Sequence, residues 1–151
     1  MIAPVEPSAL PGLARLMADS SLLQRYGMTR DGALTSLRDA LAGGDVILAP
    51  RPTVEAGFAW LSFAPRILNG AAYLRLLLVA EPGSGLGGQL LSAAEDVARA
   101  RAANHLYLLA TTDNLAARRF YERHGYGHVG DLPGLVLPEL DEALYHKRLR
   151  V

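Results

Sequence analysis

A run of glycines follows an apolar segment in the middle of the chain. The residues from Leu77 to Gly88 read L-L-V-A-E-P-G-S-G-L-G-G, and the residues after them have the apolar spacing of a helix. Glycine lets the backbone come close to an anion with its N–H groups turned inward, and the N-terminus of a helix carries a partial positive charge. This pattern predicts a loop that binds the phosphate groups of a ligand.

A second segment, from Asn114 to Tyr126, reads N-L-A-A-R-R-F-Y-E-R-H-G-Y. Asn114 and Tyr121 are seven residues apart, and in a helix this spacing places them on nearly the same face, about 10 Å apart along the axis. Because helical side chains lean toward the N-terminus, the phenol of Tyr121 is expected to point back toward Asn114. One elongated ligand could therefore contact both side chains.

Taken alone, the glycine loop allows a second interpretation. Gly83, Gly85 and Gly88 match G-x-G-x-x-G, a fingerprint of dinucleotide-binding folds. Those folds also place an acidic residue at the end of the next strand, about 20 residues further on, to bind a ribose. Here the next strand reads H-L-Y-L-L-A and contains no acidic residue. Asp113 lies beyond the end of this strand. Dinucleotide binding is kept only as a remote alternative.

Together, the glycine loop and the segment from Asn114 to Tyr126 resemble the GNAT superfamily of N-acetyltransferases, over residues 74–130. In that family a loop of pattern V-x-P-x-x-[Q/R]-x-x-G-x-G/A binds acyl-CoA and precedes an N-x-x-A-x-x-F-Y-x-x-x-G-Y/F element. Here the loop is shorter, and Pro82, which has no N–H, stands where Gln or Arg is usual. Phosphate contacts are therefore expected from residues 83–88. The resemblance implies acetyl-CoA as cosubstrate, bound by Leu77, Leu78, Val79, Gly83, Ser84, Gly85, Leu86, Gly87, Gly88, Asn114 and Tyr121.

The resemblance also implies roles in acyl transfer from a thioester. The backbone N–H of Val79 is expected to bind the acetyl oxygen, and Tyr121 is the expected general acid for the departing thiolate. A phenol with a pKa of about 10 can protonate a thiolate whose thiol has a pKa of about 8.5, because the proton moves as the C–S bond breaks. Glu81 follows the strand directly and is the candidate general base for the amine.

Each of these residues also has a purely structural interpretation. Asn114 could do no more than start its helix, and Tyr121 could be a core aromatic residue. Glu81 could be an exposed acid in a loop. Arg118 and Arg119 could contact the adenosine phosphates or be solvated charges on the helix.

The surrounding sequence predicts the elements that position these segments. Ser8 and Thr29 are expected to cap two early helices, and Thr112 or Asp113 a short helix that ends at His124. Strands are expected over residues 45–49, 54–63, 72–79, 105–110, 126–130 and 141–149. The predicted fold class is α/β (α+β). The resemblance implies a GNAT-like mixed, mostly antiparallel sheet of six to seven strands with about four helices, splayed between strands 4 and 5.

Length and composition exclude several other classes of protein. The length of 151 residues predicts one domain. The resemblance implies that residues 1–151 form a single N-acetyltransferase domain. Lys plus Arg equals Asp plus Glu at 15 each, so no positive field would gather nucleic acid. The absence of cysteine excludes a cysteine nucleophile and a thiolate metal site, and no metal is expected. The apolar stretches are far shorter than the ~20 residues of a membrane helix, and the first residues lack a signal-peptide pattern. A cytoplasmic location without membrane contact is expected.

The resemblance implies an acetyl-CoA-dependent N-acetyltransferase, an acyltransferase that transfers the acetyl group directly to a primary amine. The acceptor would be a small molecule or a peptide. A non-catalytic CoA-binding or regulatory module of the same fold is the alternative. Exposed sheet edges can pair two copies of a chain, so a homodimer is also open.

Overall fold

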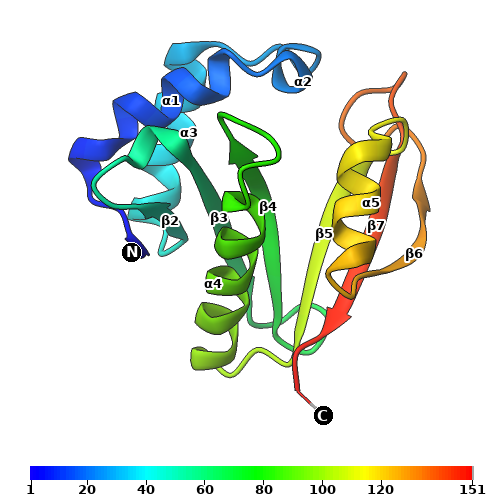
Figure 1. Cartoon of the computed structure of the whole chain (residues 1–151). Coiled ribbons are helices and arrows are strands. Elements are labelled where there is room, and N and C mark those ends of the chain that lie inside the picture. Colours follow the sequence, from blue (N-terminus) through cyan, green and yellow to red (C-terminus); the bar gives the residue numbers. More distant parts are fainter. Residues whose placement is uncertain (151) are drawn as a thin grey trace. The chain divides into compact units, whose positions relative to one another are not determined.

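The computed structural model describes residues 1–150, which form seven strands and five α-helices (Figure 1). The strands form one sheet in the order β1-β2-β3-β4-β5-β7-β6. Strands β4 and β5 are parallel, whereas the pairs β1–β2, β2–β3, β5–β7 and β6–β7 are antiparallel. This mixed, mostly antiparallel sheet confirms the predicted fold class. The strands are β1 (Ile2–Pro4), β2 (Val46–Pro50), β3 (Gly57–Ala64), β4 (Ala71–Val79), β5 (His105–Thr111), β6 (Gly127–Leu132) and β7 (Glu142–Arg148).

The chain divides into two compact units. The first contains Met1–Ser62 and Leu76–Asp96, and the second contains Phe63–Arg75 and the chain from Val97 onward. Strand β4 and helix α4 contribute residues to both units. That residues 1–151 form a single domain stays a prediction. The α-helices are α1 (Leu10–Ala18), α2 (Ser21–Gln24), α3 (Arg30–Ala42), α4 (Leu86–Ala100) and α5 (Leu115–Arg123).

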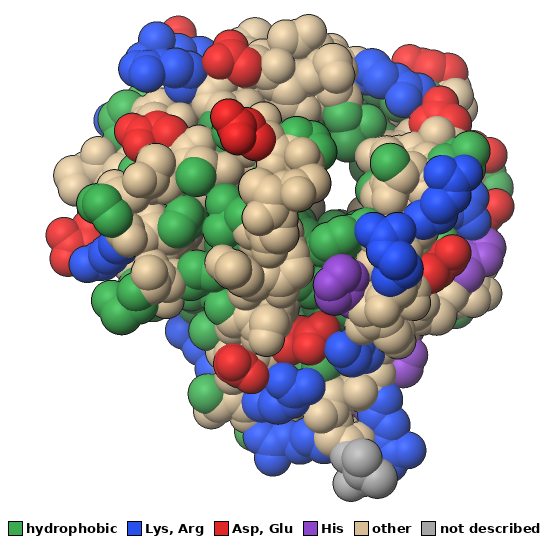
Figure 2. Space-filling view, in the orientation of Figure 1, with side chains coloured by type: hydrophobic (Ala, Val, Ile, Leu, Met, Phe, Trp, Pro, Cys, Tyr) green, Lys and Arg blue, Asp and Glu red, His purple; other side chains and the backbone are tan. Residues whose placement is uncertain are grey.

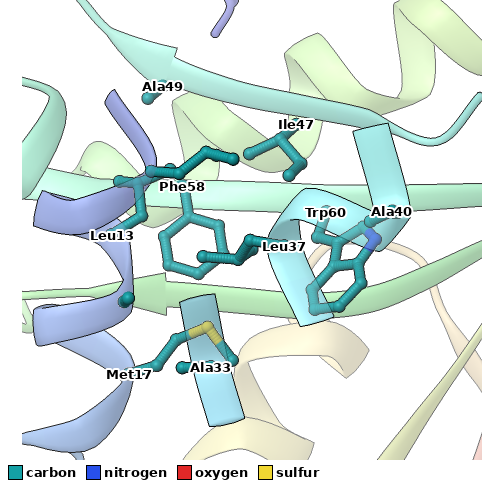
Figure 3. Close-up of a cluster of buried hydrophobic side chains, with 11 residues drawn as sticks. Leu13, Met17, Ala33, Leu37, Ala40, Ile47, Ala49, Phe58 and Trp60 are labelled. Carbon is teal, nitrogen blue, oxygen red and sulfur yellow. The ribbon is translucent and has the colours of Figure 1, made fainter. Parts of the chain in front are cut away.

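The core of the first unit lies where α1 and α3 pack on strands β2 and β3 (Figure 3). Its members are apolar residues at helical spacing on the two helices and at alternate positions on the strands. The indole N–H of Trp60 donates a 2.8 Å hydrogen bond to Asp45, so its polar atom is paired. Leu76 and Leu78 of β4 pack against this cluster and tie the end of β4 to it. The buried cluster comprises Leu10, Leu13, Ala14, Met17, Ala33, Leu37, Ala40, Ile47, Ala49, Phe58 and Trp60.

The first helices follow the sequence signals only in part. Thr29 accepts a hydrogen bond from the N–H of Gly32, so it caps α3 as predicted. Ser8 does not cap α1. It lies inside a 3-10 turn, Pro7–Ala9, which leads directly into the helix. Proline favours the first positions of a helix, so Pro7 starts the turn one residue before the predicted cap. The short helix α2, capped by Ser20, is an addition to the predicted elements.

The second unit is built on strands β5, β7 and β6 and the first half of β4. Strand β7 pairs along the whole of β5, from His105 opposite Arg148 to Thr111 opposite Glu142. Helix α5 lies over the face of β5 and β7 (Figure 1). The buried side chains on that face alternate along each strand, as expected of a sheet covered on one side. They are Leu106, Leu108, Ala110, Ala143 and Tyr145.

The parallel pairing of β4 with β5 is short. It joins residues 72–74 to residues 106–108, although β4 continues to Val79 and β5 to Thr111. The last residues of β4, from Leu76, belong to the first unit. This early end of the pairing agrees with the predicted splay between strands 4 and 5.

Neither charge sign dominates the visible surface. Figure 2 shows acidic and basic side chains on the same face, as expected from a sequence with 15 basic (Lys and Arg) and 15 acidic (Asp and Glu) residues. Among residues 1–150, no helix has both the length and the apolar character needed to cross a membrane. In the same part of the chain, no group of three or more His, Asp or Glu side chains is placed to bind a metal ion.

Candidate active site

The predicted phosphate loop connects β4 directly to α4 in the first unit. Gly83 and Gly85 both have φ of +86°, in the left-handed region that favours glycine. A Cβ atom at either position would meet nothing within 4 Å, so the backbone conformation, rather than lack of space, requires glycine there. Gly85 precedes the first helical residue, Leu86, and its carbonyl accepts the N–H of Gln89 at 3.3 Å. The loop therefore ends at the N-terminus of α4.

The first turn of α4 contains Leu86, Gly87 and Gly88. The first N–H groups of a helix have no intrahelical acceptor and carry the positive end of the helix dipole. The hydroxyl of Ser84 accepts the N–H of Leu86 at 3.4 Å. The arrangement has the form of an anion-binding helix terminus, built from residues 83–88.

The start of β3 holds the end of β4 in place. A Cβ atom on Gly57 would lie 2.7 Å from the carbonyl oxygen of Leu78 and 3.1 Å from the Cα of Val79. One residue earlier, the carbonyl of Ala56 accepts the N–H of Ala80 at 2.9 Å. Gly57 thus permits a close backbone approach, and no motif in the sequence identified it.

The loop between β4 and α4 leaves its acid in solvent. Glu81 and Pro82 are exposed. An exposed carboxylate in a loop is the structural alternative for Glu81, and the catalytic role of Glu81 stays a prediction.

Helix α5, in the second unit, carries the other two predicted contacts. Its cap is Asn114, whose Oδ1 accepts the N–H of Ala117 at 3.2 Å. The prediction that Thr112 or Asp113 caps this helix is wrong, because the chain makes a turn through those residues first. The cap uses only the carbonyl oxygen of the side chain. The amino group of the same amide is a separate donor, which a coenzyme contact would use.

Tyr121 lies on the buried face of α5 and is 8% exposed. Its ring meets the rings of Phe120, Tyr126 and Tyr145 at centroid distances of 5.3, 5.8 and 6.4 Å. Burial raises the pKa of the Tyr121 phenol above its ordinary value of 10.0. The residue therefore keeps its proton at neutral pH. Its pKa is higher than the ordinary value from which the sequence argument started.

Arg118 is a partly exposed residue of α5 that belongs to a hydrogen-bonded network. Its Nε donates to the hydroxyl of Tyr145 at 3.0 Å, and another guanidinium nitrogen donates to the carbonyl of Thr112 at 2.9 Å. The Tyr145 hydroxyl donates in turn to Glu122 at 2.7 Å. The network joins α5 to β7 and to the turn before the helix, so Arg118 has protein partners on both sides of it.

The predicted coenzyme contacts are thus divided between the two units. Leu77, Leu78, Val79 and residues 83–88 form one continuous strand, loop and helix start in the first unit. Asn114 and Tyr121 share one helix in the second unit. Their assignment as coenzyme contacts stays a prediction.

Comparison with known proteins fits this strand–loop–helix geometry. The model of the acetyltransferase (GNAT) family matches residues 31–126, which include the whole of β4, the glycine loop and α5. The chain belongs to the GNAT family of acetyltransferases. Residues 31–126 make up more than half of the chain, and the expected resemblance is thereby confirmed. No curated protein sequence matches the chain.

Solved structures of GNAT proteins share the fold over nearly the whole chain. A protein from Desulfovibrio desulfuricans, assigned to the GNAT family of acetyltransferases, superposes with a TM-score of 0.81 at 22% identity, covering 99% of both chains. A ribosomal-protein-alanine N-acetyltransferase from Brucella melitensis gives 0.79 at 18% identity, over 98% of this chain and 99% of the other. An aminoglycoside 6'-N-acetyltransferase in complex with coenzyme A gives 0.80 at 16% identity, over 100% and 98%. At these identities the likeness shows the GNAT fold alone.

Proposed function

We propose that this GNAT protein is an acetyl-CoA-dependent N-acetyltransferase that acts on a primary amine of a small molecule or a peptide. The observation that carries the proposal is the loop between β4 and α4, with two left-handed glycines placed directly before a helix N-terminus. The family match spans this loop. Structural neighbours of the same fold include one solved with coenzyme A.

The residues of the loop would bind the cosubstrate through their backbone. The N–H groups of residues 83–88 would donate to the diphosphate, and the N–H of Val79 would donate to the acetyl oxygen as negative charge develops there. These donors come from the main chain. Their use depends on glycine conformation and helix position, which the structure describes, more than on side-chain identity.

Tyr121 would supply the proton for the departing thiolate. Burial raises its pKa, so the phenol is fully protonated at neutral pH. The same dry surroundings disfavour a free thiolate, because burial penalises any charged form. Proton transfer concerted with C–S cleavage avoids both charged species. Glu81 is one candidate for the group that takes the proton of the amine.

The acceptor is proposed only as a class. The neighbours include an enzyme named for aminoglycosides and one named for an alanine of a ribosomal protein. A small-molecule amine and a peptide amine are therefore both reasonable acceptors for this chain. A non-catalytic CoA-binding module of the same fold is the competing function. The presence of Pro82, where the family usually has Gln or Arg, favours it.

The deciding experiment combines binding with turnover. Calorimetry should show binding of acetyl-CoA and none of NAD. A panel of amines and peptides, assayed by release of free thiol, should then identify at least one acceptor. Coenzyme binding without thiol release from any acceptor would support the non-catalytic module. Binding of NAD and not of acetyl-CoA would contradict the proposal altogether.

A further inference from the structure

Two histidine side chains form a hydrogen bond between β5 and β7 in the second unit. Nδ1 of His105 lies 2.8 Å from Nε2 of His146, and both residues are half-buried. The ring centroids are 5.0 Å apart, and the ring planes differ by 28°. These two distances differ by about the radii of the two rings, so the bonded nitrogens lie between the ring centres. The rings therefore meet edge to edge, in line for a hydrogen bond.

The protonation state of the two rings decides whether this contact is attractive. In a neutral imidazole one ring nitrogen carries a proton and the other accepts, so here one ring donates and the other accepts. A first added proton goes to the outer nitrogen of the donor ring, and the hydrogen bond becomes charge-assisted and stronger. A second added proton places an N–H on both facing nitrogens and a positive charge on both rings. Two donors only 2.8 Å apart repel each other, so doubly protonated rings must separate.

The nearest groups on the same strands are aromatic or cationic. The Tyr107 ring lies 4.8 Å from that of His146, and Arg148 is the register partner of His105. Burial lowers the pKa of the His146 imidazole, and the charge of His105 lowers it further. Both effects oppose a second proton on the pair.

The neighbouring segments do not supply a compensating acid. On β6, the register partner of His146 is Gly127, and Asp131 is hydrogen-bonded to His128 at 2.8 Å. Glu142 shares the face of His146 by strand alternation but lies four residues away along β7. Within residues 1–150, no carboxylate is hydrogen-bonded to either ring of the pair. The other titratable groups on β4 and on the chain before β5 and after β7 are Tyr73, Arg75, Arg99, Arg101 and Arg150.

The pair lies at an end of the sheet where other contacts of the second unit meet. Leu149, directly after β7, donates its N–H to the carbonyl of Asn104, directly before His105, at 2.7 Å. Lys147 donates to the carbonyl of His124, the C-cap of α5, at 2.9 Å. Separation of the two rings would therefore loosen the end of β7 and, through it, the C-terminus of α5.

We propose that His105 and His146 form a pH-sensitive latch, which holds the end of β7 on β5 at neutral pH and releases it when both rings are protonated. No sequence motif points to this pair, because its residues are 41 positions apart and meet only through the strand register. The latch does not depend on the proposed acetyl transfer. It can be tested without an acceptor.

The direction of the pH effect follows from proton binding in the folded and unfolded chain. Two free imidazoles in the unfolded chain each have a pKa of about 6.5. The folded pair takes one proton without losing its hydrogen bond and takes the second only at lower pH. Below about pH 6.5 the unfolded chain therefore binds more protons than the folded chain, and stability falls as the pH falls. One extra proton bound on unfolding raises the unfolding equilibrium constant by about tenfold for each pH unit.

The rival explanation is a hydrogen bond that does not act as a switch. The contact between the two rings would then be as strong at pH 5 as at pH 7. Any loss of stability in acid would come from groups elsewhere in the chain, and it would not begin at the end of β7.

Two variants keep a hydrogen-bonding group and remove one titrating ring. His105→Asn and His146→Gln place an amide, which both donates and accepts, near the positions of Nδ1 and Nε2. Chemical denaturation at pH 7, 6 and 5 measures the unfolding equilibrium constant. From pH 6 to pH 5 we expect this constant to rise by up to about tenfold more in the wild type than in either variant. The control is His128→Gln, an exposed histidine of β6 whose ring lies against Tyr145 on the other face, which should keep the steep rise.

Amide hydrogen exchange shows whether the release is local. In the wild type, the N–H of Leu149 should lose protection between pH 7 and pH 5, after correction for the intrinsic exchange rate. The N–H of Thr112, bonded to the carbonyl of Asp141 at the other end of the two strands, should keep its protection. In His146→Gln both amides should stay protected at pH 5.

A steeper loss of stability in the wild type, together with selective loss of protection at Leu149, would support the latch. Equal pH dependence in the wild type and both variants would overturn it. Equal protection of Leu149 and Thr112 in the wild type at pH 5 would overturn it as well. If one variant does not fold at pH 7, the other variant and the wild-type amide exchange decide the question.

Discussion

The loop between β4 and α4 and the helix α5 reach their proposed roles by opposite means. In the loop, the important features are backbone conformations: two glycines at φ of +86° and a helix N-terminus. In α5, they are side chains: the buried ring of Tyr121 and the network of Arg118, Tyr145 and Glu122. A change that adds a Cβ atom should therefore impair the proposed role of the loop, and removal of the Tyr121 hydroxyl should impair the proposed role of the helix.

The largest effect is expected from Tyr121→Phe. The change removes the proposed proton donor and keeps the ring that packs against Tyr126 and Tyr145, so the fold should persist. We expect kcat to fall by about 10²-fold or more, in the range typical of general acid catalysis, with acetyl-CoA affinity unchanged. Thiol release and calorimetry measure the two quantities.

A matched control and a pH profile sharpen this prediction. Tyr126→Phe removes a hydroxyl from the neighbouring ring, 5.8 Å away, and should leave kcat close to wild type. Because burial raises the pKa of Tyr121 above 10.0, Tyr121 should stay protonated below pH 10. The wild-type kcat should therefore not decrease below pH 10 through deprotonation of Tyr121. Equal rates for Tyr121→Phe and wild type would rule out Tyr121 as the general acid.

The second effect is expected from Gly57→Ala, which tests the backbone side of the contrast. The added Cβ atom would lie 2.7 Å from the Leu78 carbonyl oxygen, so the end of β4 must shift. Such overpacking costs about 1–3 kcal/mol in the free energy of unfolding, which chemical denaturation measures. The displacement of Val79 should also lower kcat.

Gly130→Ala is the control for this change, since a Cβ atom there meets nothing within 4 Å. It should leave both stability and kcat nearly unchanged. If Gly57→Ala is as stable and active as Gly130→Ala, the close approach of β3 to the end of β4 has no importance for the site.

The sequence predicted the loop better than the helix network, for a physical reason. The glycine loop is local: the glycines, the strand before them and the helix after them are adjacent in the chain. The network depends on long-range register, since Tyr145 is on β7 and its partners are on α5, 23 and 27 residues earlier. The apolar periodicity of a sequence does not indicate such a long-range contact. The same holds for Gly57, whose role depends on residues of another strand.

The elements themselves show the same distinction. The long strands and helices were predicted because their apolar periodicity is strong. Strand β1, only three residues long and ending in Pro4, has no periodicity to detect. The predicted position of the α5 cap is wrong because Thr112, Asp113 and Asn114 are all good cap residues. Only the path of the turn decides that Asn114 is the one that accepts from Ala117.

A third prediction concerns Gly85→Ala. An alanine in the left-handed region costs about 1–2 kcal/mol, and space is not limiting because nothing lies within 4 Å. The loop should relax by turning its N–H groups away from the phosphate position. A loss of about 1.4 kcal/mol corresponds to a tenfold weaker acetyl-CoA affinity, which calorimetry would detect.

The control for this prediction is Gly44→Ala, at a glycine with φ of +92° and equally open surroundings between α3 and β2. It should show a similar loss of stability without a change in affinity. A similar weakening of acetyl-CoA binding in both variants would mean that the effect is general strain and not loss of phosphate contacts.

The smallest effect is expected from Tyr145→Phe. The hydroxyl accepts from Arg118 at 3.0 Å and donates to Glu122 at 2.7 Å, so its removal breaks two hydrogen bonds to charged groups. The two charges are four residues apart on α5 and can then pair directly, which limits the loss to about 1 kcal/mol. The melting temperature should fall by a few degrees, and acetyl-CoA affinity should hardly change, because Asn114 keeps its own cap bond. If Tyr145→Phe instead weakens acetyl-CoA binding as much as Gly85→Ala does, the side-chain network acts on the coenzyme too. The contrast between a backbone-built loop and a helix held by side chains would then be lost.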